Sequence, residues 1–112
     1  MSNYKSQTAV LNSQDFDTSL TVEYDQDQTN GTILTPTSGT RLAVKGVYVS
    51  SEATSGFVRI LIDNNTICTF FANESPVYVP VIVKGLRNSA LKITSNLGAD
   101  KNYFVLVNYR EE

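Results

Sequence analysis

Apolar and polar residues alternate along most of this chain in short runs. The clearest two runs are Arg41–Val49 and Phe57–Ile62, which the polar segment Ser50–Gly56 separates. Every second residue of such a run points to the same face of a β-strand, so one face can be buried and the other left in water. No stretch of useful length has the 3.6-residue period of an amphipathic helix. The pattern therefore predicts an all-β chain.

Further runs of the same kind predict short strands with turn residues between them. Pro80 lies inside the alternating run Val77–Val83, which favours an edge strand because proline cannot donate to a sheet ladder. The other expected strands are Thr8–Leu11, Ser19–Tyr24, Thr32–Leu34, Thr66–Phe71, the segment of Leu91 and Ile93, and Tyr103–Tyr109. About eight short strands predict a single antiparallel β-sandwich or jelly roll over residues 9–112, preceded by a flexible arm over residues 1–8.

The run that begins at Arg41 changes phase at its only glycine. Leu42 and Val44 share one parity, whereas Val47 and Val49 have the other. A β-bulge or bend at Gly46 would let both pairs face the core.

The final run, Tyr103–Tyr109, is apolar on both faces. Phe104 and Leu106 lie on the face opposite to Tyr103 and its partners at every second position. A strand covered on both sides is either central in the fold or half of a contact between subunits. The second alternative makes Tyr103, Phe104 and Leu106 interface candidates.

The charge of the chain is small but unevenly placed. The net charge is −2 over 112 residues, which argues against binding to nucleic acid because a phosphate backbone needs a clustered basic face. Through residue 40, Lys5 is the only cation beside five carboxylates, those of Asp15, Asp17, Glu23, Asp25 and Asp27. This acidic segment is either a solvated surface or a contact to a basic surface, on the same body or on a neighbouring subunit. A signal peptide and a membrane-spanning run are both absent, so no membrane partner is expected.

The sequence offers little for catalysis. It has no histidine, the commonest general base and metal ligand, and its single cysteine, Cys68, lies in an apolar run where a core position is expected. Asp25 and Asp27 begin a segment that starts like a calcium loop, but the positions that need glycine and glutamate hold Asn30 and Pro36. These aspartates are therefore weak metal candidates, and we expect no enzyme activity and no cofactor.

Sugar binding is an alternative, because many sugar-binding modules are β-sandwiches of this size. Such sites use exposed aromatic rings. The chain lacks tryptophan, and the tyrosines that fall in expected strands have packing as their default role: Tyr48, Tyr78, Tyr103 and Tyr109. A calcium-dependent adhesion module is a further alternative.

From Gly39 onward the chain resembles small β-sandwich virion proteins of tailed bacteriophages, the head-decoration and related accessory proteins. The matching features are the run GTRLAVKGVYVS, the loop Ser50–Gly56, the hairpin VRILIDNN and the closing FVLVNYREE. The resemblance implies a non-enzymatic structural protein of the virion, made in the host cytoplasm, that decorates or stabilises the particle. Capsid decoration is the first expectation and a tail accessory role the second.

The same resemblance implies a homo-oligomer, expected to be a trimer, whose partners are the phage major capsid protein or tail proteins. Binding to an assembled lattice would stabilise that lattice by mass action, and many symmetric copies would add their effects. Tyr4 in the arm and the acidic residues Asp15, Asp17, Asp25 and Asp27 are then candidates for the contact.

Overall fold

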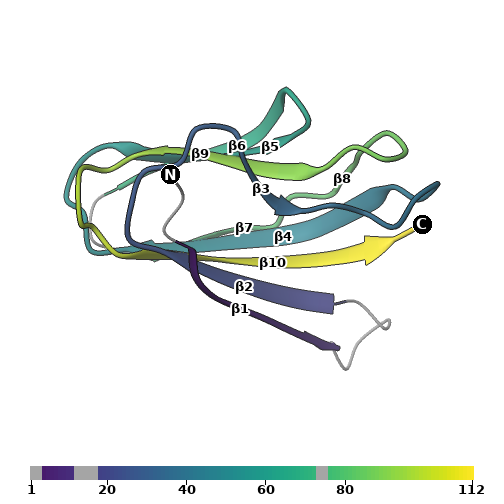
Figure 1. Cartoon of the computed structure of the whole chain (residues 1–112), viewed down its shortest axis with the longest axis horizontal. Coiled ribbons are helices and arrows are strands. Elements are labelled where there is room, and N and C mark those ends of the chain that lie inside the picture. Colours follow the sequence, from purple (N-terminus) through teal and green to yellow (C-terminus); the bar gives the residue numbers. More distant parts are fainter. Residues whose placement is uncertain (1–3, 12–17, 73–75) are drawn as a thin grey trace.

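The computed structural model describes residues 4–11, 18–72 and 76–112, with the backbone alone for residues 4–11. Ten antiparallel strands in this part of the chain form two sheets that face each other as a β-sandwich (Figure 1), as the alternation predicted. The strands are β1 (Tyr4–Leu11), β2 (Thr18–Tyr24), β3 (Gly31–Leu34), β4 (Leu42–Ser51), β5 (Phe57–Ile62), β6 (Asn65–Phe71), β7 (Val77–Val79), β8 (Val83–Lys84), β9 (Leu91–Asn96) and β10 (Tyr103–Glu111).

The two sheets differ in size and in what they cover. The larger, sheet A, has the order β1-β2-β10-β4-β7, with β8 also paired to β4, and the smaller, sheet B, has the order β3-β9-β5-β6. Figure 1 shows them as two layers, with the C-terminal strand β10 in yellow between β2 and β4. The strand that is apolar on both faces is thus central in its sheet.

The core lies between the inner faces of the two sheets. Val22, Val47 and Val107 of sheet A are fully buried, as are Ile60 and Ile93 of sheet B. Burying branched side chains on a pleated surface contributes roughly 1.5–3 kcal/mol for each residue of this kind. On β10 the buried positions alternate with half-buried ones, so the outer face of sheet A keeps some apolar surface near solvent.

The expected irregularity at Gly46 is confirmed. Asn108 of β10 lies opposite Gly46, but the next residue, Tyr109, lies opposite Val44, which makes Lys45 the extra residue of a β-bulge. The phase change keeps four apolar side chains of β4 in the core on both sides of the bulge, those of Leu42, Val44, Val47 and Val49.

Two segments differ from the expected layout. The run Val77–Val83 is divided into β7 and β8, because Pro80 interrupts the pairing, and both pieces pair with the edge of β4. Residues 4–8, expected in an arm, are the beginning of β1, which pairs with β2 over its length. Residues 1–3 of the expected arm lie outside the described residues. The count is therefore ten strands in the described chain rather than about eight.

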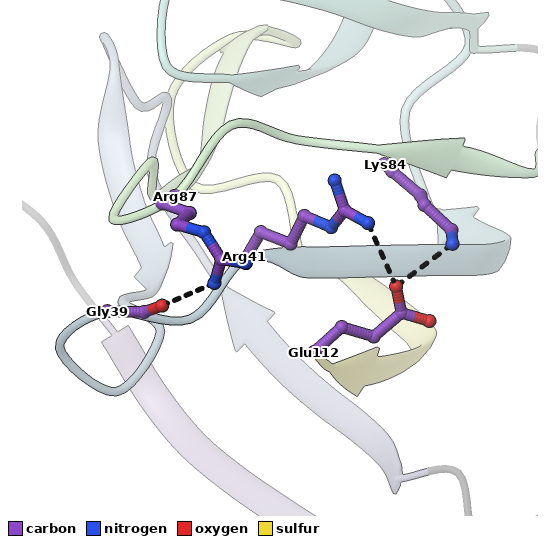
Figure 2. A network of polar contacts seen from close by, with 5 residues as sticks. All are labelled: Gly39, Arg41, Lys84, Arg87 and Glu112. Carbon is purple, nitrogen blue, oxygen red and sulfur yellow. Dashed lines mark hydrogen bonds and ion pairs between the residues drawn. The ribbon is translucent and has the colours of Figure 1, made fainter.

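Backbone and side-chain contacts connect the end of β10 to the residues just before β4. The backbone of Arg41 and Glu112 exchanges two hydrogen bonds, of 3.0 and 2.9 Å. A carboxylate oxygen of Glu112 lies 2.9 Å from Lys84 Nζ and 3.6 Å from an Arg41 nitrogen, while Arg87 donates to the carbonyl of Gly39 at 2.6 Å (Figure 2). The hydrogen bond from Lys84 lowers the pKa of the Glu112 carboxyl. At this end of the sandwich, Lys84 and Arg41 therefore share the carboxylate of Glu112, and Arg87 bonds the backbone nearby.

Among the residues that the structure describes, no helix could serve as a membrane span.

Candidate functional site

Among the side chains that the structure describes, three aromatic ones lie on neighbouring strands at the outer face of sheet A. Tyr78 of β7 lies opposite Tyr48 of β4 in the sheet register. The ring of Phe104, on β10, meets the ring of Tyr48 edge to face, with 5.6 Å between centroids. Tyr78 is 53% exposed, and the other two are half-buried. We call Tyr78, Tyr48 and Phe104 the aromatic row.

The absence of a side chain at Gly46 leaves room for the Tyr78 ring. A Cβ atom built on Gly46 would stand 2.5 Å from the Tyr78 hydroxyl oxygen and 3.0 Å from two of its ring carbons. No other residue has room at this position without moving the ring. Gly46 therefore has two roles, since it shifts the phase of β4 and lets the hydroxyl end of Tyr78 rest on the backbone.

A pocket of about 330 Å³ opens at the Phe104 end of the row. Phe104 belongs to both features, so the aromatic row and this end pocket are continuous. Glu52 Oε1 accepts hydrogen bonds from the backbone and the side-chain amide of Asn102, at 2.9 and 3.4 Å, and the Glu52 amide donates to the Asn102 carbonyl at 3.0 Å. The described residues that line the pocket are Glu23, Tyr24, Ser50, Ser51, Glu52, Asn102, Tyr103 and Phe104.

Beneath the pocket, two stacked tyrosines and a set of hydrogen bonds connect sheet A to sheet B. The rings of Tyr24 and Tyr103 stack with 5.4 Å between centroids. The Tyr103 hydroxyl donates to the Gln26 carbonyl at 2.8 Å and lies 2.7 Å from Ser95 Oγ on sheet B. Burial raises the pKa of Tyr103 well above its ordinary value, so this group stays protonated and able to donate. These contacts connect the floor of the pocket to sheet B and to the loop that follows β2.

The loop that resembles the start of a calcium site is hydrogen-bonded to the segment that follows β9 through backbone amides. The Asp27 carboxylate accepts from the amides of Leu97 and Gly98, at 2.7 and 3.2 Å. Asn30 has the positive φ of 47° expected for an Asn-Gly turn. In the described part of the chain, no three His, Cys, Asp or Glu side chains gather as metal ligands would.

We expect Asp27→Ala to lower the free energy of unfolding by about 2 kcal/mol, because a carboxylate bonded to amides is lost from a loop junction. Urea denaturation would measure the loss. Asp100→Asn is the matched control, since its side chain keeps an oxygen acceptor for Gln26 and its positive φ of 60° suits asparagine. If added calcium stabilised the native chain and not Asp27→Ala, the carboxylate would act as a metal ligand and not only as an acceptor for the loop amides.

The interface candidates fall in different places. Phe104 and Leu106 lie half-buried on the outer face of sheet A, Asp25 and Asp27 lie in the loop after β2, and Tyr103 is in the core with 3% of its surface exposed. Burial makes Tyr103 a structural residue within the chain. Asp15, Asp17 and the side chain of Tyr4 lie outside the described residues.

The sequence pattern did not predict that these three aromatic rings lie side by side. One signal could have found it, namely the parity of each ring within its strand. Tyr48 lies between two buried valines and Phe104 between Tyr103 and Val105, so both point away from the core. Tyr78 has the same place between Val77 and Val79.

Comparison with known proteins identifies no family. No family model matches the chain, and no curated protein does. The solved structures to which the chain is similar include three carbohydrate-binding modules. A family 29 carbohydrate-binding module is 14% identical, with 96% of this chain and 80% of that one covered and a TM-score of 0.43. A family 36 carbohydrate-binding module, in complex with calcium and xylotriose, is 15% identical, with 98% of both chains covered and a TM-score of 0.37.

The third structure is the C-terminal family 6 carbohydrate-binding module of a laminarinase from Zobellia galactanivorans. It is 11% identical, with 93% of this chain and 91% of that one covered and a TM-score of 0.37. At these identities and scores, an assignment of function depends on the surface of the chain itself.

Proposed function

We propose that this β-sandwich is a non-catalytic carbohydrate-binding domain and that the outer face of sheet A is its binding surface. The observation that carries the proposal is the aromatic row of Tyr78, Tyr48 and Phe104. Sugar rings present faces of C–H groups beside rims of hydroxyls, so they suit aromatic rings flanked by hydrogen-bonding groups. The end pocket supplies such groups directly beside Phe104.

Contacts within the row and with the backbone order these rings before a ligand arrives, which favours binding. The rings of Tyr48 and Phe104 pack edge to face, and the hydroxyl end of the Tyr78 ring lies against the Gly46 backbone. Side chains that are already ordered lose little conformational entropy when a ligand arrives. Three neighbouring strands of a sheet lie about 5 Å apart, so the row spans about 10 Å, enough for about two sugar units.

The proposal predicts that Tyr48→Ala and Tyr78→Ala each weaken sugar binding about tenfold, since each removes a stacking surface worth roughly 0.5–1.5 kcal/mol beyond its buried area. Calorimetric titration with cellotriose, xylotriose, laminaritriose and maltotriose measures the effect, once a glycan array has shown which class binds. Phe71→Ala is the matched control, because Phe71 is 74% exposed and lies at the edge of sheet B. Absence of binding to every sugar, or an equal loss in Phe71→Ala, would refute the assignment.

Gly46→Ala tests the row without touching an aromatic residue. The added methyl must displace the Tyr78 hydroxyl end, so we expect a loss of affinity close to that of Tyr78→Ala. In the Tyr78→Ala background the same change should have little further effect on binding, and this double-mutant cycle isolates the coupling. Additive losses would mean that Gly46 acts through the β4 bulge and not through the ring.

A second candidate is the structural virion protein, which the half-buried Phe104 and Leu106 on the same face favour. Here a second copy, a major capsid protein or a tail protein would cover these side chains, and the chain would form a trimer. Light scattering at high protein concentration distinguishes the two functions. A mass three times that of the chain, lost in Leu106→Lys, would support the virion role, and a monomer would exclude the trimer.

A further inference from the structure

We infer that the edge of the sandwich around β8 is a contact surface for a second copy of this chain. Ile82, directly before β8, is 83% exposed, and Leu86, two residues after β8, is 79% exposed. Large apolar side chains that gather at one place on a surface mark an interaction site, whereas single ones are ordinary. These two side chains lie outside the aromatic row, so the contact does not depend on the proposed function.

A small pocket lies beside the two exposed side chains. It measures about 130 Å³, and its apolar lining comes from both sheets, with Ile62 and Ile67 on β5 and β6 and with Val83 and Leu86 in and after β8. This volume is below the range of about 300–1,000 Å³ for small-molecule sites. It is close to that of a dry cavity of about 150 Å³, lined by similar side chains, that holds one benzene. The pocket is thus sized for one apolar side chain of a protein.

A second copy supplies what both features need. In a two-fold symmetric dimer, the same patch of each copy forms the contact, so an exposed side chain of one copy can fill the pocket of the other and the reverse. Ile82 is directly followed by Val83 of the pocket lining, so both parts belong to one patch. The contact uses side chains and needs no pairing of strand backbones.

The charges of this edge suit self-association. Residues 76–83 contain no charged side chain, so the net charge of −2 on each copy does not oppose the contact there. The lining of the pocket includes one anion, Asp63, and one cation, Lys84. A surface of one sign would favour a partner of the opposite sign, whereas a surface that carries both signs is compatible with its own copy.

The area available predicts a weak dimer. Two aliphatic side chains and the rim of the pocket offer each copy a few hundred Å², roughly half of the 800 Å² per partner that a stable complex buries. We therefore expect a Kd on the order of 100 μM. Sedimentation equilibrium between about 10 μM and about 1 mM should show the average mass rising from near that of one chain toward that of two. A mass that stays at one chain throughout, or that passes two, would overturn the inference.

Ile82→Ser and Leu86→Ser test the exposed side chains. The symmetry removes each side chain twice from the contact, so each variant should weaken the dimer about tenfold. Phe71→Ser is the matched control, because Phe71 is 74% exposed but lies at the other end of β6 from Asn65, which lines the pocket. An equal loss in Phe71→Ser would mean that exposed apolar surface adheres without a specific contact, which would contradict the inference.

Ser89→Leu tests the pocket by filling it. Ser89 lines the pocket and is half-buried, so a leucine there occupies the space with its own side chain. This variant gains apolar surface, yet the dimer should be lost, whereas general adhesion would become stronger. Leu106→Lys should leave the dimer unchanged, since Leu106 lies on β10, away from this edge. A dimer that survives in Ser89→Leu, or is lost in Leu106→Lys, would place the contact elsewhere. Ile82 and Leu86 are exposed, so their variants report on the contact even if Ser89→Leu disturbs the fold.

Discussion

Gly56→Ala is expected to lower the free energy of unfolding by about 3 kcal/mol or more, which places it among the most damaging single substitutions. Gly56 precedes β5 and has a φ of +95°, which residues with a side chain rarely adopt. A Cβ atom there would overlap the carbonyl oxygen of Asn96 and stand 3.2 Å from the Cα of Leu97. Both atoms are backbone, so no side-chain rotation relieves the overlap.

The cost of this change should extend beyond the turn. The Gly56 carbonyl accepts the Ala72 amide at 3.0 Å, and Phe57, the next residue, pairs with Phe71 on one side and Asn96 on the other. A shift at Gly56 therefore disturbs the contact of β5 with both of its neighbours. Urea denaturation followed by circular dichroism measures the loss.

Gly39→Ala is the matched control for that experiment. Gly39 has a similar φ of +85°, but in the described part of the chain no atom beyond its own chain neighbours stands within 4 Å of the Cβ position. The control should therefore lose only the cost of the backbone conformation, about 1 kcal/mol. Equal losses in the two variants would mean that positive φ, and not the overlap with Asn96, decides the effect.

Cys68 is expected to react at least about tenfold more slowly with thiol reagents in the folded chain than in the unfolded chain, at about pH 8. Burial raises the pKa of its thiol from 9.0 to about 12. The thiolate is the reactive form, and below both values a shift of this size reduces its population about a thousandfold. The more basic thiolate that remains is a stronger nucleophile, so the rate falls by less than the population. A colorimetric disulfide reagent, with and without concentrated guanidinium chloride, measures the two rates.

The same pKa shift makes the stability depend on pH in a defined direction. The folded chain holds the thiol proton more tightly than the unfolded chain, so the contribution of this group is complete below pH 9 and declines as the pH rises toward 12. Cys68→Ala should remove this part of the decline. As a control for access, Thr54→Cys in the Cys68→Ala background places a thiol at an exposed position and should react at the rate of the unfolded chain. If native Cys68 reacted as fast as this control, the thiol would not be shielded by packing.

Local patterns were sufficient to predict the fold class and the bulge. Both depend on side-chain parity within one strand, which a run of neighbouring residues contains in full. The change of phase at Gly46 is visible in the sequence because Leu42 and Val44 on one side, and Val47 and Val49 on the other, must all be buried. Phe57–Ile62 was predicted with its observed bounds for the same reason.

The candidate site could not be predicted in this way, because it is assembled across strands. Tyr48, Tyr78 and Phe104 meet only because β4 pairs with β10 on one side and β7 on the other. Alternation gives the face of each residue but not the order of the strands or their register. The end pocket depends on longer-range placement still, since Glu23 lies on β2, Glu52 directly follows β4, and β10 separates these two strands.

The N-terminal segment shows a related limit. Residues 4–8 are mostly polar, and the hydrophobic pattern offers no reason to place them in a sheet. Their strand is formed by backbone pairing with β2, at the edge of sheet A, where a residue needs no buried face. An edge strand of this kind is invisible to a method that counts apolar positions.

Pro80 has a consequence for how copies of this domain can aggregate. Open sheet edges are templates on which further strands add and fibrils grow, and natural proteins interrupt them. Here the outermost strand along β4 is divided into pieces of three and two residues, with Pro80 and the bulge between them. Such an edge offers no continuous row of amides to an incoming chain. Ordered assembly through sheet faces remains open to the molecule, while edge-to-edge growth from β7 and β8 is disfavoured.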